Sequence, residues 1–183
     1  MEFIIYTEED LFRFAFKHGT DKELLEILIK DFGLDVNWRK KRFYDTLLYQ
    51  ALKLNNLDVV EFLISKGACV NCSLGGYPSS EDSHGNLSLL DVVEDVPSLR
   101  GKCIDRLKQL GAISFENLPE DKIKAADLTR QASDEKYIYR TVDQVKLIIM
   151  LAPSKVQEKL KSFISSCKYE TLEDIQNKNN SHR

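Results

Sequence analysis

The sequence is poor in proline, glycine and cysteine and has no long apolar run, and each of these features is required by some class of protein. Among 183 residues there are only 4 Pro and 8 Gly, which excludes collagen-like and proline-rich low-complexity chains. The 4 Cys are sparse and widely spread, so we expect a reducing compartment and no disulfide framework. The longest strictly apolar run, from Leu147 to Ala152, is far shorter than the about 20 residues that a membrane-spanning helix needs. We therefore expect no membrane span.

A strong charge of either sign is also missing. The 26 Lys and Arg nearly balance the 29 Asp and Glu, giving a formal net charge of −3. This balance argues against a general nucleic-acid binder and against a protein held to membranes by charge alone. The start of the chain lacks the basic segment of a secretory signal and becomes acidic soon after its first apolar residues. We expect a cytoplasmic protein, in its own cell or in a host cell.

Residues suited to catalysis or metal binding are scarce. There are 3 His in the chain, and none belongs to a recognisable catalytic motif. Cys69 and Cys72 have the C-x-x-C spacing, but no second pair follows, and His84 would supply only a third zinc ligand. The sequence predicts a non-enzymatic protein without metal or cofactor.

A repeated pattern runs through the first two thirds of the chain. The stretch from Asp45 to Asn71 contains two short apolar segments at helical spacing, and its second half resembles residues 23–37. Asn37 and Asn71 end these two copies at equivalent positions. A third copy begins at Ser88 and ends near Ala112. Each copy predicts a helix, a tight turn, a second helix, and then a glycine with an extended segment.

This pattern resembles the ankyrin repeat over about residues 8–114. In the second unit the resemblance is carried by residues of the opening, the turn, the second helix and its cap: Thr46, Leu48, Ala51, Asn55, Asn56, Val59, Val60, Leu63, Gly67 and Ala68. The third unit keeps Ser88, Leu90, Ile104, Leu107, Gly111 and Ala112, with Asp91 at the position of the usual His. No unit has the proline of the family's opening.

The resemblance and the helical spacing together predict an all-α fold. We expect an ankyrin solenoid of about three helix–turn–helix units with finger loops over residues 1–114, in which Leu63 is buried. A helical extension, 115–175, should cap the stack, with Leu147, Ile148 and Leu151 covering the third unit. Residues 176–183 should form a flexible tail. Asn37 and Asn71 should tie down their hairpins, and enzymatic hydroxylation of these asparagines is the alternative that the resemblance suggests.

One of the finger loops that the resemblance implies combines aromatic and basic residues. The segment from Trp38 to Tyr44 holds four consecutive bases between aromatic side chains, and Trp beside Arg is typical of interface hot spots. Packing of these aromatics onto the stack is an equally weighted alternative. The concave face of an ankyrin stack, built from fingers and first helices, adds further candidates. The predicted partner-binding residues are Trp38, Arg39, Arg42, Tyr44, Tyr49, Gln50, Lys53, Tyr77 and Asp91.

The function that the resemblance implies is a protein–protein interaction module, an adaptor or an inhibitor, which is monomeric when unbound. A small ankyrin chain with an unfamiliar extension also resembles bacterial or viral proteins that act inside a host cell. Two alternatives stay open. One is an enzyme or effector whose activity lies in the C-terminal region, which a polar cleft of Lys, Asp and Tyr would favour. The other is a structural or self-assembling subunit.

Overall fold

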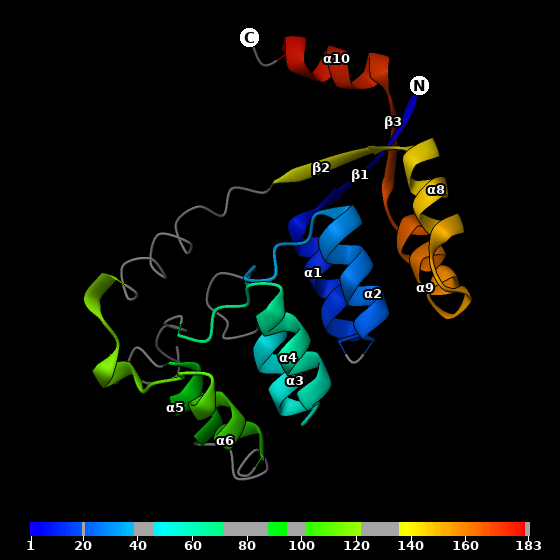
Figure 1. Ribbon diagram of the computed structural model, residues 1–183. Helices are drawn as coiled ribbons and strands as arrows, with labels where there is room; N and C mark the ends of the chain where they lie inside the picture. The colour runs from blue at the N-terminus through cyan, green and yellow to red at the C-terminus, as the bar shows by residue number, and fades with distance from the viewer. Residues whose placement is uncertain (20, 39–45, 72–87, 95–101, 122–135, 182–183) are drawn as a thin grey trace. The chain divides into compact units, whose positions relative to one another are not determined.

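The computed structural model describes residues 1–19, 21–38, 46–71, 88–94, 102–121 and 136–181 (Figure 1). The chain divides into two compact units. The sheet unit comprises Met1–Lys17, Glu23–Leu34 and Glu135–Arg183, and the repeat unit comprises His18–Lys22 and Asp35–Asp134. The sequence predicted a domain boundary after residue 114. In the structure the division is different, because both ends of the sequence belong to one unit.

The sheet unit is built on a three-stranded antiparallel sheet that the all-α prediction missed. β1 (Glu2–Thr7) lies between β2 (Tyr137–Thr141) and β3 (Lys168–Thr171). Ile5 pairs with Tyr139 on one side, and Ile4 pairs with Tyr169 on the other. Aromatic and β-branched residues dominate β1 and β2, which is the composition that favours strands. The all-α expectation is wrong for this unit because these short segments pair only with one another, across a long sequence separation.

Each of the three strands runs directly into a helix through a threonine. β1 leads into α1 (Glu8–Lys17), β2 into α8 (Val142–Leu151) and β3 into α10 (Leu172–Ser181). The last strand residue is Thr7, Thr141 or Thr171, and its side chain accepts a hydrogen bond from the backbone N–H three residues later, at 3.1, 3.2 and 3.3 Å. The side chain of that later residue, Asp10, Gln144 or Asp174, accepts the threonine N–H in return.

This reciprocal arrangement is a capping box, and it satisfies two donors that a helix start would otherwise leave unpaired. The unit thus repeats one strand–threonine–helix junction three times. α10 also occupies residues 172–181, most of the stretch where the sequence predicted a flexible tail.

Two further helices pack against α1 and α8 and contribute to the core of the sheet unit. They are α2 (Lys22–Ile27), continued by the π-helical turn η1 (Leu28–Phe32), and α9 (Ser154–Ser165). The rings of Tyr6, Phe32 and Phe163 meet with centroids 5.6 to 6.1 Å apart, and the Tyr6 hydroxyl donates to the Phe32 carbonyl. The apolar stripe of α9 is buried and consists of Val156, Leu160, Phe163 and Ile164.

α9 begins at Ser154, and the preceding residue, Pro153, makes no side-chain cap. Leu147 and Leu151, two of the residues expected to cover the third repeat, are 51% and 74% exposed.

The repeat unit contains two antiparallel helix pairs in its described residues. α3 (Leu47–Lys53) pairs with α4 (Leu57–Ser65), and α5 (Leu89–Glu94) pairs with α6 (Lys102–Gln109), which is followed by the short 3-10 turn η3 (Phe115–Asn117). Gly67 follows α4 with a φ of 91°, and Gly111 follows α6 with a φ of 85°. Both glycines therefore end their helices in the left-handed conformation, which glycine adopts without strain. Leu63 is fully buried, which confirms the predicted register of α4.

Two asparagines join successive segments of the repeat unit in the same way. The Asn37 side chain donates to the Gly67 carbonyl at 2.9 Å and accepts from the Cys69 N–H at 2.7 Å. Asn71 repeats this pattern, donating to the Gly111 carbonyl at 2.8 Å and accepting from the Ile113 N–H at 3.0 Å. Each asparagine therefore fixes the glycine turn of the next repeat, which is the structural role expected from the sequence.

The cysteines differ in part from the expectation of a reducing compartment without a disulfide framework. Cys69 is disulfide-bonded, and its partner is not among the side chains that the structure describes. Cys167 is a free, half-buried thiol in the sheet unit. None of the helices in the described part of the chain combines the length and the apolar character that a bilayer crossing requires.

The burial of Leu63 leads to a prediction of stability. Leu63→Ala should lower the free energy of unfolding by about 2–5 kcal/mol, because it removes a fully buried side chain and leaves a cavity. Urea denaturation followed by circular dichroism measures this loss. A decrease below about 1 kcal/mol would contradict the burial of this side chain.

The asparagine links lead to a second prediction. Asn71→Ala should destabilise the protein by about 1–2 kcal/mol, because two hydrogen bonds to the next repeat are lost. Asn71→Asp keeps the acceptor for the Ile113 N–H but loses the donor, so its loss should be smaller in the same urea titration. Equal stability of Asn71→Ala and the unmodified protein would show that the links are incidental.

Candidate functional site

The outward face of α3 carries three of the predicted partner-binding residues. Leu47, Leu48, Ala51 and Leu52 of this helix are buried. Tyr49 and Gln50 are half-buried and Lys53 is exposed, at the helical spacings that place them on one face. The Lys53 ammonium lies 5.5 Å from the centroid of the Tyr49 ring, within the range of a cation–π contact. The structure therefore brings these three side chains together as an amphipathic surface, which we call the α3 face.

The beginning of α3 fixes the position of Tyr49. Thr46 is the N-cap, and its hydroxyl accepts the backbone N–H of Tyr49 at 3.0 Å. A capped helix start holds the backbone of its first turn, so the Tyr49 side chain is presented from a defined position.

Trp38 lies beside Asn37, at the edge of the described residues. Its side chain is half-buried, and its backbone N–H donates to the Asp35 carbonyl at 3.0 Å. The other predicted finger residues, Arg39, Arg42, Tyr44 and Tyr77, lie outside the described residues. Of the predicted finger cluster, the structure thus places Trp38 alone.

Asp91 has a structural task that the sequence analysis overlooked. Its carboxylate accepts the backbone N–H of Ser88 at 2.8 Å and that of Phe115 at 2.9 Å, while the Ser88 hydroxyl accepts the Asp91 N–H at 3.2 Å. The carboxylate therefore caps α5 and holds the segment that follows α6. The spacing Ser-x-x-Asp before an apolar run is the signal that would have revealed this role.

A second candidate site is a polar cleft of about 340 Å³ within the sheet unit. Its Tyr and Lys, Tyr137 and Lys168, come from the C-terminal region as the enzymatic alternative requires, whereas its Asp, Asp10, comes from α1. The lining residues come from β1, α1, the start of β2 and the turn between α9 and β3: Ile5, Tyr6, Thr7, Glu9, Asp10, Arg13, Tyr137, Ser166, Cys167 and Lys168.

Most of the polar groups of this cleft are engaged in the fold. Arg13 pairs with Glu9 at 2.6 Å, and Asp10 caps α1 through Thr7. The Cys167 thiol donates to the Phe163 carbonyl at 3.3 Å. Burial raises the pKa of Cys167 to about 12, and the nearby Asp10 carboxylate contributes in the same direction.

The cleft consequently lacks an activated cysteine, because the thiolate is the nucleophilic form and this thiol is protonated at neutral pH. Among the described residues, no three His, Cys, Asp or Glu side chains converge in a way that could hold a metal ion. The cleft offers groups that can bind a polar ligand.

Comparison with known proteins identifies the region around the α3 face. Residues 44–73, which include α3, α4 and Asn71, match the family model of the ankyrin repeat. No curated protein sequence and no solved structure matches the chain. Ankyrin repeats are stacked units that present extended surfaces to partners. The chain therefore contains an ankyrin repeat segment, which indicates a protein–protein interaction module.

Proposed function

We propose that this protein is a non-enzymatic adaptor or inhibitor, acting in the cytoplasm of its own or a host cell, that binds a partner protein through the α3 face and the adjoining finger at Trp38. The observation that carries the proposal is the position of Tyr49, Gln50 and Lys53 on the first helix of the matched repeat. First helices and fingers form the binding surface in the proteins that this segment resembles.

The physical properties of the α3 face support this role. Tyrosine offers a large apolar ring with a polar end, so it contributes binding energy at little cost in conformational entropy. Lys53 over the Tyr49 ring adds a positive charge at the edge of the face. A partner surface with an apolar pocket for the ring and an acidic group for the lysine would complement both features.

The alternative function is an enzyme or effector whose activity lies in the C-terminal helical region, part of which belongs to the sheet unit, with the repeats recruiting the substrate. The polar cleft is the observation that favours it, since Asp10, Tyr137 and Lys168 all line this cavity. The protonated state of Cys167 weighs against nucleophilic catalysis there. We therefore place binding by the repeat unit first.

The binding proposal predicts a large effect for two aromatic residues and a small effect for a neighbouring base. A partner identified by pull-down and mass spectrometry is titrated with each variant. Tyr49→Ala and Trp38→Ala should each weaken binding by about 2 kcal/mol or more, because truncated interface aromatics are typical hot spots. Lys53→Ala should have a smaller effect that disappears at high salt.

Tyr139→Ala is the matched control, because Tyr139 is 45% exposed on β2 of the sheet unit. It should leave binding unchanged, and circular dichroism must show that every variant remains folded. Unchanged affinity of both Tyr49→Ala and Trp38→Ala would exclude this surface as the binding site.

The cleft yields a prediction about pH. Burial raises the pKa of Cys167 to about 12, so far less thiolate is present at neutral pH than for an ordinary cysteine. Alkylation of Cys167 by iodoacetamide, followed by peptide mass spectrometry, should therefore be very slow at neutral pH and accelerate as the pH approaches 12. Rapid alkylation at neutral pH would reveal a thiolate and would favour the enzymatic alternative.

A further inference from the structure

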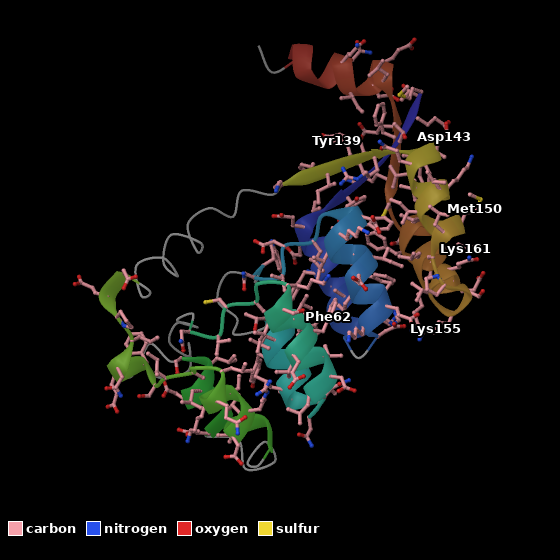
Figure 2. All side chains as sticks on the ribbon, viewed as in Figure 1. Phe62, Tyr139, Asp143, Met150, Lys155 and Lys161 are labelled. Atoms are coloured by element: carbon pink, nitrogen blue, oxygen red, sulfur yellow. The ribbon has the colours of Figure 1, made fainter. Side chains whose placement is uncertain are left out.

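No further inference is drawn: the strongest candidate, the apolar face of α8 on which Leu147, Met150 and Leu151 lie exposed (Figure 2), carries none because nothing in the described part of the structure shows what covers it.

Discussion

The pairing of β1 with both β2 and β3 is the interaction on which the sheet unit depends. β1 is the middle strand, so the first residues of the chain supply both edges against which the C-terminal strands and helices are organised. Pairing across such a distance in sequence costs loop entropy, and the cost grows only slowly with loop length. Burial of Tyr6, Phe32 and Phe163 against one another offsets it. The long segment of the repeat unit, Asp35–Asp134, consequently lies in sequence between two segments of the sheet unit, Glu23–Leu34 and Glu135–Arg183.

A threonine capping box is present at each place where a helix of the sheet unit directly follows a strand. Thr7, Thr141 and Thr171 each end a strand in extended conformation and begin a helix by accepting a backbone N–H. The residue three positions later returns the bond. A short polar side chain therefore changes the direction of the chain and satisfies the helix terminus at the same time.

The repeat unit is held together by nearest-neighbour contacts. Asn37 and Asn71 bond the glycine turn of the repeat that follows, and the ion pair between Arg106 and Glu61 joins α6 to α4 at 2.9 Å. Tyr49, Gln50 and Lys53 lie on the outward side of α3, opposite the buried Leu48, Ala51 and Leu52.

The sequence by itself determined the features of the helices that depend on local chemistry. The helical spacing of Leu63, the glycine ends at Gly67 and Gly111, and the stripe of Val156, Leu160, Phe163 and Ile164 follow from periodicity and backbone sterics, so they could be predicted. The α3 face could be located in the same way, because a helix with one buried side presents its other side outward.

Only the tertiary structure decided which segments meet. The strands β1, β2 and β3 are short, and such short apolar segments become strands only through pairing that local pattern does not encode. For the same reason the sequence could not show that Leu147 and Leu151 lie exposed, that Asp91 is occupied by the N–H of Phe115, or that Cys167 lies in a cleft with Asp10. Each of these depends on groups brought together from distant parts of the chain, and periodicity along one segment carries no information about them.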